Sequence, residues 1–111
     1  MYKVGQGILG KITFVDGTMP AYDRTYLIIK ADNYDVSVLN VSSIRGKEHK
    51  LGFATNYRIC NYNPPFNYPS FVKLDSLTTV SSDFIDNNCK LLHSGAVLSN
   101  TDIQQILNRL T

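Results

Sequence analysis

The sequence predicts a mainly β domain that ends in one α-helix, arranged as a small closed or half-open barrel with the helix packed on it. Most of the chain consists of short β-branched and aromatic segments separated by Gly, Asp, Asn and Pro, which is typical of strands joined by turns. The final segment changes to a helical spacing of apolar residues. Its 111 residues, 43% of them hydrophobic, are enough for one domain over residues 1–111 with its own core.

The strands are predicted in chain order from alternating apolar and polar residues. The first runs from Gly10 to Val15 and ends at Asp16-Gly17, a pair that tolerates positive φ. The next two are joined by the Asx-rich turn at 32–35 and form a hairpin. Because proline lacks a donor and restrains its predecessor, Pro64 and Pro65 stop the fourth strand. The strands expected after the first are Tyr26–Ala31, Val36–Ser43, Tyr57–Tyr62, Ser70–Asp75 and Thr78–Val80.

Two further segments have distinct patterns. The stretch from Arg45 to Gly52 is polar and is predicted to be an exposed loop. The last helix is predicted to begin after Ser99 as N-cap, with Asp102 in its first turn and Arg109 in its last, as the helix dipole favours. Its apolar face is formed by residues spaced i, i+3, i+4 and i+7, namely Ile103, Ile106, Leu107 and Leu110.

Composition excludes several classes of protein. A net charge of +2, from 11 Lys and Arg against 9 Asp and Glu, is too small for a general DNA-coating protein. The chain has no signal-peptide pattern and no apolar run of the roughly 18 residues that span a membrane, so a cytoplasmic protein is expected. Cys60 and Cys89 stand alone, which favours reduced thiols over a disulfide, although one bridge between them stays open.

Catalytic and cofactor motifs are also tested. The glycines from Gly5 to Gly10 match the spacing GxGxxG, but they precede a predicted strand rather than a helix, so no nucleotide cofactor is expected. His49 and His93 lack partners at metal-ligand spacing, so no metal is expected. A GxSxG nucleophile elbow is missing as well, which disfavours a serine hydrolase.

The order of segments resembles the MazF/PemK (Kid) family of toxin endoribonucleases. Gly10–Asp16 is similar to that family's opening G-D-I-V-x-V-D, and Asp23–Ile29 is similar to its G-R-R-P-x-L-V-V segment. Val38–Ser43 resembles V-x-P-I-T-S, and Tyr68–Val80 resembles P-S-V-V-R-C-D-Q-I-R-T-V. Gly95–Ile103 resembles I-G-R-L-S-x-E-D-L. The resemblance therefore covers nearly the whole chain and implies the barrel fold shared by CcdB, MazF and PemK plasmid-maintenance toxins.

The resemblance implies a site. Arg24 falls on the family's active-site arginine and Asp75 on its aspartate, while Ser42 replaces its threonine and Lys73 its strand arginine. Thr25 replaces the family's proline. Lysine keeps the charge of arginine but loses the bidentate fork that grips a phosphate. The loop from 16 to 23 is also short compared with many relatives.

The implied activity is metal-independent cleavage of single-stranded RNA by its own 2′-hydroxyl, leaving a 2′,3′-cyclic phosphate and a 5′-hydroxyl. Asp75 is then the expected base, Arg24 and Lys73 stabilise the phosphorane, and Ser42 donates a hydrogen bond. His49, whose ordinary pKa suits proton transfer at neutral pH, is the expected acid. RNA contacts are expected at four residues around and after the polar loop, which are Lys47, His49, Lys50 and Tyr62. A homodimer and a small antitoxin partner are implied as well.

Other interpretations remain open. Without the resemblance, Lys73 and Asp75 are better explained as a surface ion pair worth about 0–1 kcal/mol, and Ser42 as an exposed strand-end hydroxyl. Aromatic residues such as Tyr57, Phe66 and Tyr68 are able to stack bases, but such residues more often fill cores or dimer contacts. CcdB-like relatives are non-enzymatic gyrase inhibitors, and a catalytically weakened RNA-binding relative is the third alternative.

Overall fold

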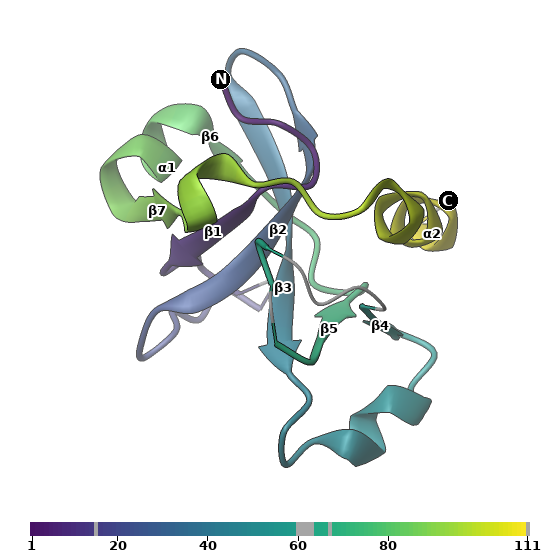
Figure 1. Cartoon of the computed structure of the whole chain (residues 1–111). Coiled ribbons are helices and arrows are strands. Elements are labelled where there is room, and N and C mark those ends of the chain that lie inside the picture. Colours follow the sequence, from purple (N-terminus) through teal and green to yellow (C-terminus); the bar gives the residue numbers. More distant parts are fainter. Residues whose placement is uncertain (15, 60–63, 67, 111) are drawn as a thin grey trace.

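A computed structural model of the chain describes residues 1–14, 16–59, 64–66 and 68–110 (Figure 1). Within these residues, antiparallel strands form one sheet in the order β4-β5-β3-β2-β1-β7, and β6 pairs with β3 off this path. The strands are β1 (Gly7–Gly10), β2 (Arg24–Ala31), β3 (Asp35–Ser43), β4 (Asn56–Arg58), β5 (Ser70–Lys73), β6 (Thr78–Ser81) and β7 (Cys89–Leu91). The helices are α1 (Ser82–Asn88), α2 (Asn100–Leu110) and the short 3₁₀ helices η1 (Glu48–Gly52) and η2 (Leu92–Gly95).

The predicted hairpin is confirmed in β2 and β3, the two longest strands. Its turn is held by Asp32, whose Oδ1 accepts from the backbone N–H groups of Tyr34 and Asp35, both at 2.8 Å. These bonds to the ionised carboxylate hold the pKa of Asp32 below its usual range. The hairpin therefore forms from local contacts and supplies the centre of the sheet.

Strand β3 pairs with two strands in succession. Its later part, Val41–Ser43, pairs with β5, and its earlier part, Asp35–Val38, pairs with β6. Between these parts, Asn40 N donates to Ser76 Oγ at 2.8 Å, and that hydroxyl donates to Lys73 O at 2.6 Å. The Ser76 side chain thus replaces the strand-to-strand hydrogen bonds that β3 lacks at Asn40, where the chain leaves β5 and turns toward β6.

The two faces of the sheet have separate cores, because alternate residues of a strand point to opposite faces. One face, with Leu27, Leu39 and Val41, packs against Ile106 of α2. The other, with Tyr26, Ile28 and Val38, packs against Ile85 of α1. Figure 1 shows α1 and α2 on opposite sides of the central strands.

The C-terminal helix begins as predicted. Asp102 N donates to Ser99 Oγ at 3.2 Å, and the same hydroxyl donates to Asp102 Oδ2 at 2.9 Å. Tyr57 OH donates to the other carboxylate oxygen at 2.8 Å, which ties α2 to β4. The N-cap assignment is therefore confirmed, and the fully buried Asp102 carboxylate also anchors the helix to the sheet.

The barrel expectation is confirmed only in its coarser part. The protein is mainly β with a C-terminal helix, but the sheet is not closed among the described residues, since β4 and β7 stand at opposite ends of the strand path. The predicted first strand is misplaced, because β1 ends at Gly10. The backbone N–H and C=O of Ile12 instead bond the hydroxyl of Tyr26, each at 3.2 Å, so a side chain replaces the expected ladder.

Other boundaries differ for local reasons. The loop predicted at 45–52 contains η1, and the helix α1 and strand β7 were not predicted. Strand β5 ends at Lys73, two residues early, where the turn bonded by Ser76 begins. Phe71 and Val72, which point to opposite faces as neighbours in a strand, are both fully buried because both faces of the sheet are covered at β5. The strand predicted to reach Tyr62 is β4 at 56–58, and its last residues lie outside the described part of the chain.

Candidate functional site

Three predicted site residues lie on the face of the sheet that also carries Tyr26 and Ile28. Thr25 of β2 is opposite Val41 of β3, so the next pair outward in this register is Arg24 with Ser42. Ser42 is in turn opposite Phe71 of β5, and Lys73, two residues further along β5, shares the face of Phe71. Strand ends distant in sequence therefore bring Arg24, Ser42 and Lys73 together.

Lys73 is surrounded by other positive charges. Its pKa lies below the ordinary value, first because its side chain is partly buried and then because of the charges of Lys50, Lys47 and Arg24. The negative charge of Asp75 acts in the opposite direction but is the smallest of these influences. We call Arg24, Lys47, Lys50 and Lys73 the cationic cluster. The repulsion between these positive charges is unfavourable in the unliganded protein, so it favours the binding of an anion.

Lys47 connects the segment after β3 to the site. Its Nζ donates to Ser42 Oγ at 3.0 Å, which holds an ammonium group beside the end of β3. The chain turns back here through Gly46, whose φ of 74° lies in the left-handed region that favours glycine. Lys50 follows within η1, and its carbonyl accepts from Asn56 Nδ2 at 2.8 Å, which fixes η1 against β4.

Arg24 is held between aromatic rings. Its Cζ lies 4.2 Å from the ring centroid of Tyr22 and 5.9 Å from that of Phe14, within the range of cation–π attraction. The Nε atom is buried and has no hydrogen-bond partner in the described residues. The rings orient the guanidinium while one of its donors stays unused.

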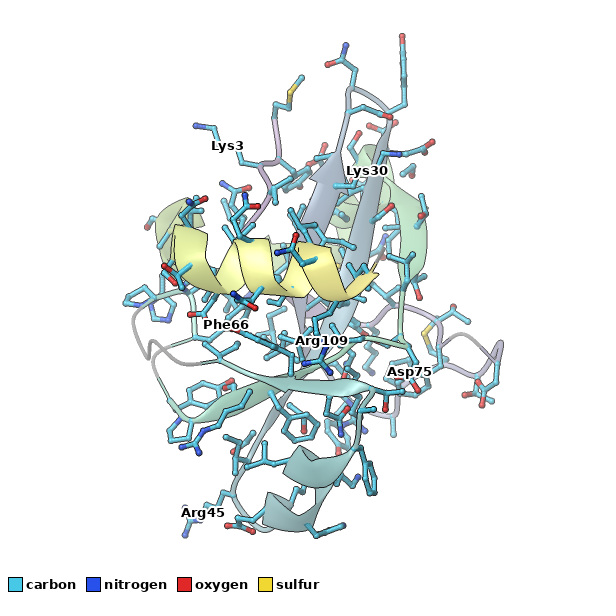
Figure 2. The ribbon with its side chains drawn as sticks, turned by 90° about the vertical axis from the view of Figure 1, so that its right-hand side faces the viewer. Lys3, Lys30, Arg45, Phe66, Asp75 and Arg109 are labelled. Carbon is cyan, nitrogen blue, oxygen red and sulfur yellow. The ribbon has the colours of Figure 1, made fainter. Side chains whose placement is uncertain are left out.

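Asp75 lies at a hollow next to the ring of Phe14. With Phe14, Asp16 and Ser76 it lines a shallow hollow of about 290 Å³, and Phe14 is also a ring partner of Arg24. The carboxylate of Asp75 is exposed. Figure 2 shows it well separated from Arg45, at the tip beyond η1, and from Lys3 and Lys30 at the other end of the molecule.

The remaining predicted RNA contacts are less well placed. His49 is exposed on η1, and its ring packs edge-on against Phe53 with the centroids 6.4 Å apart. This contact does not place it beside Ser42 or Asp75. Tyr62 lies outside the described residues.

The structure adds site residues that the sequence reasoning did not select. Tyr22 and Phe14 hold Arg24, and Asn40 is buried on the same face of the sheet. The sequence carries one signal for Asn40, since an amide in the apolar strand V-S-V-L-N-V-S-S is unusual at a core position. The sequence carries no such signal for Tyr22 and Phe14, because their role depends on their distance from Arg24 in the fold.

No family model matches the chain, and no curated protein matches it. Among the described residues, no group of three or more His, Cys, Asp and Glu side chains is placed to hold a metal ion. In the same residues, no helix is long and apolar enough to cross a membrane. Cys89 has a free thiol whose pKa is raised by burial, and Cys60 lies outside the described part.

Proposed function

We propose that this protein is an endoribonuclease that binds the backbone of single-stranded RNA at the cationic cluster. The observation that carries the proposal is the placement of Arg24, Ser42 and Lys73 on one face of neighbouring strands, with Lys47 Nζ bonded to Ser42 Oγ. Such a cluster lowers the energy of an anion brought to it, and nucleic-acid phosphates are the anions that extended basic sites most often bind.

The site also has more hydrogen-bond donors than acceptors. Guanidinium and ammonium groups only donate, and the Nε of Arg24 has no acceptor in the described residues. A phosphodiester supplies two non-bridging oxygens that accept charge-assisted hydrogen bonds. A ligand of this chemistry would relieve both the repulsion between the lysines and the unused donor.

The chemistry proposed for the site is transfer within the RNA. The 2′-hydroxyl loses its proton to Asp75 and attacks the adjacent phosphorus, and the bond from phosphorus to the 5′-oxygen breaks. Arg24 and Lys73 stabilise the negative phosphorane, and Ser42 donates to one of its oxygens. His49 is the proposed acid for the leaving oxygen, for which it has to move from its contact with Phe53. The products are a 2′,3′-cyclic phosphate and a 5′-hydroxyl.

The resemblance to the MazF/PemK family supports the choice of RNA and of a reaction that needs no metal. It also supports a homodimer acting in the cytoplasm as the toxin of a toxin–antitoxin pair, neutralised by a small antitoxin protein. These assignments belong to the proposal.

The proposal is tested by incubating the protein with a long RNA of mixed sequence in a chelator and mapping the cut sites and their ends. Arg24→Ala is the test variant, and Lys30→Ala, which removes the same charge near the other end of β2, is the control. Discrete cuts with cyclic phosphate ends, lost in the first variant and kept in the second, support the proposal. Intact RNA at high protein excess rejects it and favours the gyrase-inhibitor or weakened-relative alternatives.

A further inference from the structure

Asn40 is a buried amide whose donors are not used. It lies near the centre of β3 with only 5% of its surface exposed. Its Nδ2 is buried and has no hydrogen-bond partner in the described part of the chain. An unpaired polar group in such a position costs about 1–3 kcal/mol, so a purely structural role would favour an apolar residue there.

The described neighbours of Asn40 explain why its Nδ2 atom has no hydrogen-bond partner among them. Tyr26, directly opposite on β2, has its hydroxyl bonded to both the N–H and the C=O of Ile12. Lys73 is the next pair outward in the β3–β5 register, and an ammonium group only donates. Ser76 Oγ already accepts from the backbone N–H of Asn40 and donates to Lys73 O. Among the described residues, none of these neighbours accepts a hydrogen bond from Nδ2.

A ligand oxygen on this face of the sheet would supply the acceptor that Nδ2 lacks among the described residues. Asn40 shares its face of the sheet with Ser42, two residues along β3, and with Lys73 across the register. Positive charge dominates there, so an acceptor carrying negative charge is favoured over a neutral one.

We infer that Asn40 is a substrate-binding residue whose side-chain amide donates a hydrogen bond to a non-bridging oxygen of the RNA phosphate held by Arg24 and Lys73. This inference rests on the proposed function. Asn40 would provide a neutral hydrogen-bond donor on the same face of the sheet as Lys73, where a further lysine would increase the repulsion between positive charges.

The test measures binding of a 2′-O-methyl RNA, which the reaction above does not cut, by Asn40→Leu and Asn40→Asp. Leucine keeps the heavy-atom count and branching of asparagine and removes the unpaired Nδ2 donor, so the midpoint of thermal unfolding of this variant is expected to stay level or rise. Its affinity for RNA is expected to fall about 10- to 100-fold, as for loss of a hydrogen bond to a charged group. Its salt dependence is expected to stay unchanged, because no charge is lost.

Asn40→Asp keeps the shape of the side chain and places a negative charge where the RNA phosphate is proposed to bind. The affinity of this variant for RNA is therefore expected to fall more than 100-fold. If both variants bind the RNA within two-fold of the natural protein, the inference is wrong. If Asn40→Leu loses stability as well as affinity, Asn40 is structural and the inference is also wrong. If the natural protein binds no RNA, the proposed function itself fails.

Discussion

The salt dependence of RNA binding provides a quantitative test of the cationic cluster. Its members are Arg24, Lys47, Lys50 and Lys73. For single-stranded nucleic acid, each neutralised phosphate contributes about −0.7 to the slope of log K against log salt concentration, so four contacts predict a slope near −2.8. Affinity should then fall about 50-fold between 50 and 200 mM salt.

Replacing one lysine gives the sharpest comparison. Lys73→Met keeps most of the side-chain length but removes one charge, so the slope is expected to weaken to about −2.1. The measurement is fluorescence anisotropy of a labelled 2′-O-methyl RNA over this salt range, with Lys30→Ala, which loses a charge at the opposite end of β2 from Arg24, as the control. A control slope that weakens as much as that of Lys73→Met, or a natural protein without salt dependence, would refute the assignment of the cluster as the RNA site.

Further predictions concern stability. Because burial and like charges lower the pKa of Lys73 from 10.5, its charged form is disfavoured in the folded state, so Lys73→Met should be more stable than the natural protein at pH 7. That gain should shrink as pH rises through the folded pKa and vanish above about 10.5, measured by urea unfolding at several pH values. Tyr57→Phe removes a hydrogen bond to the buried Asp102 carboxylate and should cost about 1.5 kcal/mol in the same assay, whereas an unchanged midpoint would contradict this role. Gly10→Ala should cost about 1–3 kcal/mol, because its Cβ would lie 2.6 Å from a sulfur on β7, while Gly52→Ala, with open space around it, should stay within about 0.5 kcal/mol.

The sequence predicted those elements whose signals are local. The β2–β3 hairpin follows from alternating apolar residues around an Asp32 turn, and the last helix follows from its Ser99 cap and apolar spacing. The first strand was misplaced because Tyr26, far along the chain, bonds the backbone of Ile12. Such a contact leaves no pattern in the segment itself.

The residues of the candidate site likewise include some that the sequence reasoning selected and others that it missed. Arg24, Ser42 and Lys73 were selected by resemblance, and their meeting depends on a register that the sequence does not state. Asn40 was missed because an unsatisfied buried amide is recognisable only once its neighbours are known. His49 was selected for its ordinary pKa, but the structure packs it against Phe53.

The central claim is that the site promotes attack by the 2′-hydroxyl of RNA. The most direct measurement compares two oligonucleotides of one cleaved sequence, with ribose or with 2′-deoxyribose on the 5′ side of the scissile phosphate. The account predicts a cut with cyclic phosphate ends in the first, no cut in the second, and equal binding of both. Cleavage of the deoxyribose substrate at a similar rate would contradict it.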